Sequence, residues 1–463
     1  MHTQARLLMR VLAVAAALAL ACAGGGDRKP PPPTPPILLF AIDGLEWGLM
    51  KPLIDAGRMP AIAGLMQRGT YGYLESMVPT YSPAIWTSIA TGKNPDKHGI
   101  PHFVYRVGPG ADDYRSYTSG HRKTKAFWNI LSEYGKTVDV IGWWMTYPAE
   151  AVNGVIVAQT NTTGAMEHSE NALWKGTLLE GVDDQVYPPD LTPEVMGLLA
   201  ATDRSMDSVV TAIFGGVPQA RTEFTKLVWD QSLWAFRADA VYTRIAVRLL
   251  EDAPPPDVFA LYLSGPDVAG HRFWRYAHPE EFWHPPMAEE VEAFGSVLDD
   301  YYVHVDRVIG EVLSRVPADV TVFVISDHGM HVVNPDREFD PDDEPGFRLS
   351  GNHLDAPPGV FVAAGANITR AATPPPLDPL RPIGRAYDVL PTLLALKGIP
   401  VGEDFDGQAM QVVISPAFLE QFPIRSVKTH DDRAWEAARR DRMKEAADQA
   451  ERLEQLKSLG YIN

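Results

Sequence analysis

The segment Ile37-Leu-Leu-Phe-Ala-Ile-Asp-Gly44 decides the fold. It is a short apolar run that ends in a carboxylate and a glycine, the pattern of a buried strand with a polar residue at its carboxyl end. Helical stretches such as Pro60–Gln67 and Ala293–Val312 separate it from similar runs. This alternation predicts an α/β fold with a mainly parallel central sheet covered by helices on both faces. The other predicted strands are Thr137–Gly142, Val258–Leu263, Val320–Ser326 and Val360–Ala364.

The composition is that of a globular protein. Of the 463 residues, 45% are hydrophobic and 22% are charged, which excludes a fibrous or wholly disordered chain. The formal net charge of −18 argues against a protein that binds nucleic-acid polymers, because such proteins need a basic surface. Small anionic substrates stay compatible with this charge, since bound metal ions supply local positive charge.

The N-terminus has the pattern of an export signal. Residues 1–21 combine a weakly basic start with the apolar run Val11–Ala21, which is too short to span a bilayer. Cys22, the only cysteine, follows Ala19-Leu20-Ala21. This arrangement resembles a bacterial lipoprotein signal, whose cysteine becomes lipidated. We therefore expect an exported, membrane-anchored lipoprotein, periplasmic or at the cell surface. The alternative is an ordinary signal peptide and a secreted or periplasmic soluble protein.

The rest of the chain divides into a tether, a large body and a charged end. Residues 22–36 hold the anchor cysteine and a Pro-rich linker, and residues 37–430 form the main domain. Within it, the strand pattern lapses between about residues 161 and 256, which predicts a largely helical insert. The insert is either a cap over the site or a peripheral helical layer. Residues 431–463 are predicted to form a C-terminal helix, packed on the body or against a partner.

Carboxylates follow three of the predicted strands. Asp43 and Asp327 stand at strand ends, and Asp267 lies four residues beyond Leu263. In parallel sheets, ligands bind beyond the carboxyl ends of the strands. The three side chains are therefore expected at one rim of the sheet.

Histidines accompany these carboxylates. His271 follows Asp267 by four residues, His328 is adjacent to Asp327, and His353 ends a Gly-Asn-His loop. With Asp43 they make six nitrogen and oxygen ligands, a mixture that suits Zn²⁺. Six ligands are too many for one tetrahedral ion and about right for two. Each pair taken alone is more often structural, and an Asp after a strand often caps a helix.

A hydroxyl-rich stretch supplies candidate nucleophiles. In Pro79-Thr80-Tyr81-Ser82-Pro83, we expect the Ser82 hydroxyl just before a helix that starts at the proline. Helix amides and a metal would both favour its alkoxide there. The alternatives are that Ser82 only caps the helix, or that Thr80 is the nucleophile.

In combination, these motifs resemble the type I phosphodiesterase/nucleotide pyrophosphatase family of the alkaline phosphatase superfamily. The resemblance rests on Asp43-Gly44, on residues 82–100, and on the Asp and His motifs, which occur in the expected order. It extends over Tyr387–Leu394 and Asp406-Gly407. It implies an alkaline-phosphatase-like fold and Ser82 as nucleophile. It also implies two divalent metal ions, with Zn²⁺ the expected metal. One would be held by Asp43, Asp327, His328 and Ser82, the other by Asp267, His271 and His353.

Two departures bear on the substrate. Nucleotide pyrophosphatases carry an Asn three residues after His-Gly-Ile, where this chain has Phe103, with His102 beside it as a possible replacement. Trp143-Trp144 resembles a bacterial branch without a defined substrate, so Trp144 either lines a substrate wall or belongs to the core. A sulfatase is not expected, because Ser82 lacks the Pro and Arg context that formylglycine formation needs.

The predicted function is hydrolysis of small phosphate esters through a covalent phospho-serine. A diester is the preferred substrate class, and the alternatives are a phosphomonoesterase, an exported phospho-headgroup transferase or a non-catalytic binding protein. No nucleic-acid polymer is expected as a partner, and membrane contact is expected only through Cys22. The sequence makes no prediction of oligomeric state.

Overall fold

The computed structural model describes residues 34–108, 114–162, 175–219, 222–251, 253–333, 349–370, 380–438 and 442. The predicted signal segment, Cys22 and most of the linker lie outside the described residues. So does most of the predicted C-terminal helix, of which residues 433–438 are described and helical. No helix in the described ranges has both the length and the apolar character needed to cross a membrane.

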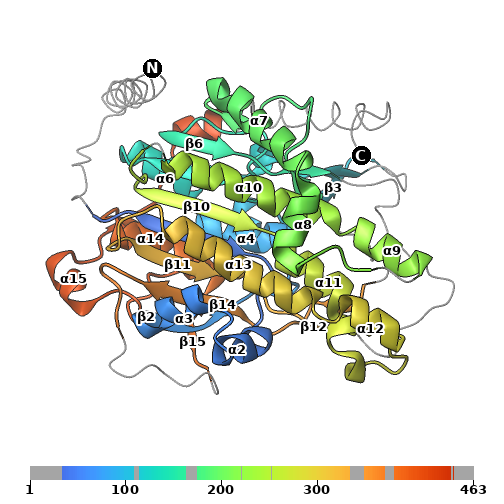
Figure 1. The fold of residues 1–463 in the computed structure, drawn as a ribbon. Coiled ribbons are helices and arrows are strands. Elements are labelled where there is room, and N and C mark those ends of the chain that lie inside the picture. Colours follow the sequence, from blue (N-terminus) through green and yellow to red (C-terminus); the bar gives the residue numbers. More distant parts are fainter. Residues whose placement is uncertain are drawn as a thin grey trace.

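A nine-stranded sheet runs through the centre of the molecule (Figure 1). The prediction of an α/β fold with a mainly parallel sheet is confirmed, because most neighbouring strands pair in parallel. In order across the sheet, the strands are β15 (Pro382–Arg385), β2 (Gly69–Glu75), β14 (Gly359–Ala364), β11 (Thr321–Ile325), β1 (Ile37–Ile42), β10 (Val258–Leu263), β5 (Val138–Ile141), β6 (Gly154–Val157) and β9 (Val186–Tyr187).

Two strands run against the others. β14 is antiparallel to both β11 and β2, and β9 is antiparallel to β6. β14 begins at the edge where β11 ends, since the backbone N–H of Ser326 donates to the carbonyl of Val360 at 2.9 Å. An antiparallel neighbour needs no crossover helix. His328, just after β11, and His353, just before β14, therefore lie at the same rim of the sheet.

Helices cover both faces of the sheet, because alternate residues of each strand point to opposite sides. On β1, Leu38, Phe40 and Ile42 join one core and Ile37, Leu39 and Ala41 join the other. The helices that contribute to the first core include α2 (Trp47–Asp55), α3 (Pro60–Gln67), α10 (Leu233–Glu251), α11 (Gly265–Ala277) and α13 (Val297–Leu313). Those of the second include α4 (Ser82–Thr91), α6 (Phe127–Glu133) and α14 (Val389–Leu396).

One predicted helix is divided. Instead of one helix over Ala293–Val312, α12 (Ala288–Phe294) ends and α13 begins at Val297. Gly295 lies at the break, and a Cβ there would be 2.6 Å from the carbonyl oxygen of Val291 and 3.2 Å from that of Tyr276. Glycine, which has no Cβ, fits at this crowded position between α12 and α11.

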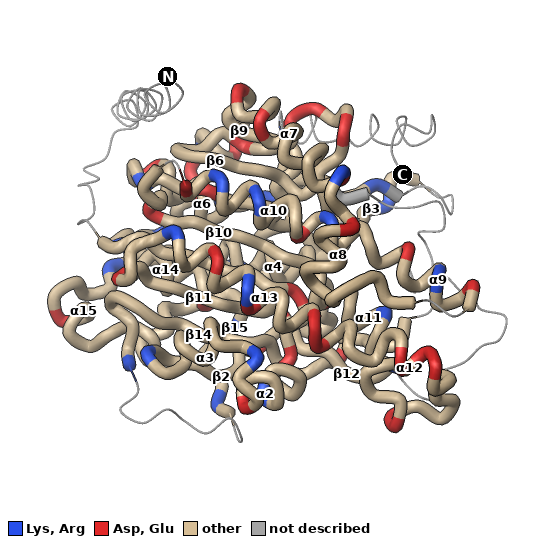
Figure 2. The backbone as a smooth tube through the Cα atoms, viewed as in Figure 1, with Lys and Arg blue, Asp and Glu red and all other residues tan. Residues whose placement is uncertain are grey.

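The segment predicted as an insert holds α7 (Thr192–Asp203), α8 (Met206–Phe214), α9 (Glu223–Asp230) and α10, together with the edge strand β9. Its helices bury residues such as Leu199, Ile213 and Trp229 in the first core. A role as a cap over the site stays a prediction. Figure 2 shows Lys and Arg interspersed with Asp and Glu over the visible face, with acidic residues on α12, whose first turn holds Glu289 and Glu290.

Candidate active site

Three neighbouring parallel strands bring the predicted ligands to one edge. Asp43 follows β1 and Asp327 follows β11, while α11 starts two residues after β10. The backbone N–H of Asp43 donates to the carbonyl of Leu263 at 2.9 Å, which joins the ends of β1 and β10. Consequently Asp43, Asp267 and Asp327 meet beyond the carboxyl ends of the central strands, with Asp43 and Asp327 buried and Asp267 half-buried.

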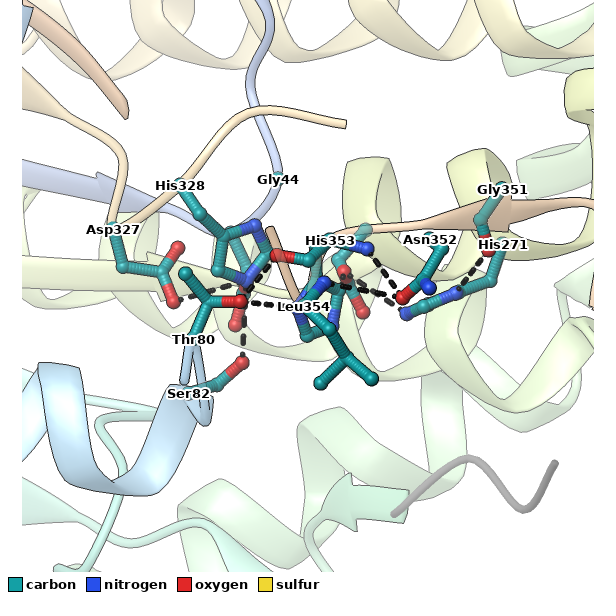
Figure 3. A network of polar contacts seen from close by, with 12 residues as sticks. Gly44, Thr80, Ser82, His271, Asp327, His328, Gly351, Asn352, His353 and Leu354 are labelled. Carbon is teal, nitrogen blue, oxygen red and sulfur yellow. Dashed lines mark hydrogen bonds and ion pairs between the residues drawn. The ribbon is translucent and has the colours of Figure 1, made fainter. Parts of the chain in front are cut away.

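The first group of side chains surrounds His328. Its Nε2 lies 3.3 Å from Asp43 Oδ1 and 3.3 Å from Asp327 Oδ2. The Ser82 hydroxyl points at the same nitrogen from the start of α4, at 3.5 Å (Figure 3). The candidate nucleophile therefore shares its nearest neighbour with two carboxylates.

The second group surrounds Asp267. Its Oδ1 lies 3.4 Å from His271 Nε2, one turn along α11, and 3.7 Å from His353 Nε2. Suitable ligand atoms of Asp43, Asp267 and His328 also lie within 4.8 Å of one another, so Asp267 borders both groups. The rings of His328 and His353 stack with their centroids 3.9 Å apart, which places the two groups side by side.

Backbone contacts orient two of the histidines. Nδ1 of His271 lies 2.8 Å from the carbonyl oxygen of Gly351, and Nδ1 of His328 lies 3.0 Å from that of Gly329. A carbonyl only accepts, so each Nδ1 carries the proton and each Nε2 presents a lone pair to the site. This is the arrangement that metal-binding histidines require.

Thr80 is engaged with His353. Its hydroxyl donates to the backbone carbonyl of His353, and its oxygen lies 3.3 Å from His353 Nδ1. Thr80 is thus placed to orient a histidine, whereas the Ser82 hydroxyl faces the ligand groups (Figure 3).

The buried carboxylates fit a bound cation. Within the described residues, Asp43 Oδ1, Asp267 Oδ1 and both oxygens of Asp327 are buried without a hydrogen-bond partner. Asp43 Oδ2, in contrast, accepts from Trp86 Nε1 at 3.1 Å and from the Tyr262 hydroxyl. Buried unpaired charge is strongly unfavourable, so oxygens left bare beside neutral imidazoles are a donor set for metal ions.

The electrostatics of the cluster agree with this donor set. Burial, together with the negative charge of Asp43, raises the pKa values of Asp267 and Asp327 well above their ordinary range. Burial favours the neutral acid at Asp43 too, but the contacts of its carboxylate with His328 and with the Tyr262 hydroxyl outweigh burial and lower the pKa of Asp43. Burial lowers the pKa of His271 to about 4 and that of His353 well below its ordinary value. His271 and His353 are therefore neutral, as ligands must be.

Ser82 starts α4 and does not cap it. Tyr81 is the N-cap, Ser82 is the first helical residue and Pro83 the second, so the hydroxyl lies one position further into the helix than the sequence predicts. Proline is favoured in the first turn, where no N–H is needed for the helix. The Ser82 side chain, 4% exposed, makes no capping hydrogen bond. The interpretation of Ser82 as only a helix cap is therefore wrong.

The predicted substrate-binding residues form an aromatic cluster with Tyr81, the residue that precedes Ser82. The ring of Tyr81, next to Ser82, has its centroid 4.5 Å from that of His102 and 6.4 Å from that of Phe103. Phe103 in turn lies 5.6 Å from Trp144. Trp144 is only 5% exposed, and its indole N–H donates to the Tyr262 hydroxyl at 2.7 Å.

Several neighbours of the ligand groups had no clear sequence signal. Tyr262 lies on a strand and reads as an ordinary core residue, yet its hydroxyl donates to Asp43. Trp86 does the same from the second turn of α4, four residues after Ser82. Only that spacing, which puts Trp86 on the same helix face as Ser82, could have indicated its place.

Residues 37–370 match the model of the family described as type I phosphodiesterase / nucleotide pyrophosphatase. None of the curated proteins matches the chain. Among solved structures, a putative sulfatase from Bacteroides thetaiotaomicron is 12% identical with a TM-score of 0.47, and covers 86% of this chain and 76% of its own. Human ectonucleotide pyrophosphatase / phosphodiesterase 5 is 13% identical with a TM-score of 0.46, covering 82% and 100%. The chain is assigned to a family by the sequence match alone, because structural similarity at these low identities and TM-scores does not support a family assignment.

Proposed function

The chain belongs to the type I phosphodiesterase / nucleotide pyrophosphatase family, and from this premise we propose a two-metal phosphodiesterase that works through Ser82. Family membership makes it a phosphoric ester hydrolase. The observation that supports the finer proposal is the position of the Ser82 hydroxyl, 3.5 Å from His328 Nε2 at the junction of the two ligand groups. Of the two candidate nucleophiles, Ser82 and Thr80, only Ser82 has its hydroxyl directed at the group around His328, since the Thr80 hydroxyl donates to the backbone carbonyl of His353.

Two divalent ions, most simply Zn²⁺, fit the two groups. Asp43, Asp327 and His328 would hold one ion beside Ser82. The other would be held by Asp267, His271 and His353, with Asp267 close enough to be shared. When bound, such ions lower the pKa of an adjacent hydroxyl and stabilise negative charge on phosphoryl oxygens.

Ser82 would form and then lose a phosphate ester. Its oxygen attacks phosphorus in line, the bond from phosphorus to the departing alcohol oxygen breaks, and phospho-serine remains. Water then attacks the same phosphorus and releases the Ser82 hydroxyl. The buried N-terminal position of Ser82 on α4 favours its anionic form, because the helix dipole is positive there. No side-chain general base is needed for either step.

The alcohol part of the ester would contact the aromatic side chains next to Ser82. Tyr81, His102 and Phe103 are each partly exposed and form a continuous edge-to-face cluster. Phe103 stands where nucleotide pyrophosphatases have a hydrogen-bonding Asn, so phosphoryl recognition by an amide is absent at that position. We therefore propose a diester with an apolar or aromatic alcohol group, with Trp144 supporting Phe103 from behind.

The cellular context follows from the sequence. We propose an exported protein that is anchored to a bacterial membrane by lipid at Cys22, and whose partners are small phosphate esters, not nucleic-acid polymers. The Pro-rich residues before Thr34 would separate the catalytic body from the membrane.

Initial rates on two chromogenic substrates test this proposal. With Zn²⁺ present, the full chain is expected to hydrolyse bis-p-nitrophenyl phosphate with a higher kcat/KM than p-nitrophenyl phosphate, and chelation is expected to abolish both activities. A preference for p-nitrophenyl phosphate would replace the diesterase by a phosphomonoesterase. Turnover that survives complete metal removal would contradict the two-metal mechanism itself.

A further inference from the structure

Two adjacent tyrosines on α13, Tyr301 and Tyr302, reach the two segments that carry the central carboxylates. Both are fully buried, with exposed fractions of 0% and 1%. Consecutive residues on a helix point about 100° apart, so one helix can address two neighbouring loops at once. We refer to Tyr301 and Tyr302 as the tyrosine pair.

Tyr301 acts at the start of α11. Its hydroxyl donates to Asp239 Oδ2 at 2.8 Å, and Asp239 extends from α10. The same carboxylate accepts from the backbone N–H groups of Ser264 and Gly265, each at 2.9 Å. Asp239 thus caps the N-terminus of α11 from another helix, which is favourable because helix N-termini attract negative charge.

The first residue of α11, Gly265, is packed tightly against Tyr301. A Cβ on Gly265 would lie 2.1 Å from the Tyr301 hydroxyl oxygen, so the helix start is packed directly against the tyrosine. Asp267 follows Gly265 by two residues and His271 by six. A shift of the cap would therefore displace both ligands together, since they belong to one rigid helix.

Tyr302 acts on the turn after β1. Its hydroxyl donates to the carbonyl of Gly44 at 2.8 Å and accepts from the N–H of Glu46 at 3.1 Å. Asp43, the first carboxylate of the site, immediately precedes this turn. The Tyr302 hydroxyl is therefore hydrogen-bonded to the backbone at both ends of the turn that follows Asp43.

The two held segments touch each other. Gly44 has φ +71°, and a Cβ there would lie 2.7 Å from the Cα of Asp267 and 3.0 Å from its Cβ. The turn after Asp43 and the first turn of α11 are thus in direct contact. The distance between these two segments is set by the contact between Gly44 and Asp267, and by the hydroxyls of Tyr301 and Tyr302, which fix one segment each.

We propose that the tyrosine pair, with Asp239, sets the spacing between the Asp43 and Asp267 halves of the metal site. These are positioning residues, because no atom of theirs touches a predicted ligand side chain in the described structure. The inference rests on the proposed two-metal function. It adds a role for α13, which would fix the distance between the two halves of the site. Neither the sequence motifs nor the family match gives α13 a role.

Zn²⁺ binding to the metal-free full chain tests the proposal. Tyr301→Phe and Tyr302→Phe each remove one hydroxyl. Each is expected to weaken binding of at least one of two Zn²⁺ equivalents by about tenfold or more in calorimetric titration, as loss of supporting partners around metal ligands does. On the chromogenic diester, kcat should fall by a similar factor while KM changes little.

Tyr242→Phe is the matched control. Tyr242 is buried on α10 and its hydroxyl donates to the carbonyl of Ala158 at 3.2 Å, away from both loops. It should lose some thermal stability and keep wild-type Zn²⁺ affinity. Asp239→Asn is a second variant at the same cap, to be used if a tyrosine variant does not fold.

Two results separate failure of the pair from failure of the function. If the wild type binds two equivalents and the variants bind them with equal affinity, the tyrosine pair has no positioning role and the proposed function is untouched. Equal weakening in Tyr242→Phe would also remove the positioning role. A wild type that binds no Zn²⁺ would remove both proposals.

Discussion

At the scale of single residues, burial decides the chemical state of the site. Burial lowers the pKa values of His271 and His353, so these two imidazoles are neutral, and burial together with the charge of Asp43 raises the pKa of Asp267. His98, outside the ligand groups, obeys the same rule. Burial and the nearby Arg122 lower its pKa to about 3, and it contacts Ser88 Oγ at 2.9 Å.

Asp239 gives a pH prediction. Burial raises its pKa from 3.8 to about 7, so between these values the folded state binds a proton that the unfolded state lacks. Wild-type stability should therefore fall as pH rises from about 4 to about 7, by a few kcal/mol at about 1.4 kcal/mol per pKa unit. Asp239→Asn should be less stable than the wild type at low pH. Its unfolding free energy should not show the fall between about pH 4 and about pH 7 that comes from Asp239.

Urea unfolding at the two ends of that range measures the effect. The informative quantity is the difference in unfolding free energy between wild type and Asp239→Asn, because other titrating groups cancel in it. We expect the wild type to exceed Asp239→Asn in unfolding free energy by less at the higher pH than at the lower. An advantage that grows with pH would show that Asp239 is stabilised as the anion, with a pKa below 3.8.

The predicted ligands could be found from sequence because each occurs in a short motif at a strand end. The structure brings Asp43, Asp267, His271, Asp327, His328 and His353 into one cluster, while their roles as ligands stay a prediction. Residues such as Tyr302 could not be found in this way. A tyrosine in an amphipathic helix reads as core, and only the fold shows which carbonyl its hydroxyl reaches.

At the scale of elements, the sequence predicts the bounds of those helices and strands that the local pattern of apolar residues determines. Pro60–Gln67 is helical over the predicted bounds, and β10 also has its predicted bounds. The direction of β14 could not be predicted, because it depends on where the chain re-enters the sheet and not on periodicity. The break at Gly295 could not be predicted either, because periodicity does not show which backbone atoms crowd that position.

The turn after β1 offers a prediction with an internal control. Gly44 and Gly57 both have φ +71°, but a Cβ on Gly44 meets Asp267 whereas one on Gly57 meets nothing within 4 Å. Gly57→Ala should therefore cost about 1 kcal/mol of backbone strain and leave kcat unchanged. Gly44→Ala should cost clearly more and reduce kcat, because it pushes Asp267 away from Asp43.

Chemical denaturation and diester hydrolysis on both variants give the comparison. Equal losses of stability with normal kcat in Gly44→Ala would mean that the turn and α11 separate without consequence. That outcome would count against close spacing as a requirement of the site.

At the scale of the whole molecule, a large two-sided core surrounds a site made of buried charge. Cys22 is the only cysteine, so no disulfide within the chain supports the fold. Stability must come from the two cores and from whatever neutralises the carboxylates. The central strands hold the site rigidly because they are buried on both faces, and three of their neighbouring carboxyl ends form its base.

Metal binding should therefore stabilise the entire fold. When free Zn²⁺ exceeds the dissociation constant of a site about a hundredfold, the unfolding free energy should rise by about 2.7 kcal/mol for that site. Calorimetric melting with and without Zn²⁺ measures this gain. His271→Ala should retain only the part contributed by the group around His328. A melting temperature independent of Zn²⁺ would contradict the assignment of the cluster as a metal site.

The most direct test of the central claim compares two serines of α4. Ser82 faces the ligand groups, while Ser88, equally buried on the same helix, contacts His98. With Zn²⁺ bound, Ser82→Ala is expected to lower kcat on bis-p-nitrophenyl phosphate by about a thousandfold or more. Ser88→Ala should stay within about threefold of wild type, because its hydroxyl is remote from the site. Wild-type turnover in a Zn²⁺-loaded Ser82→Ala variant would contradict the account.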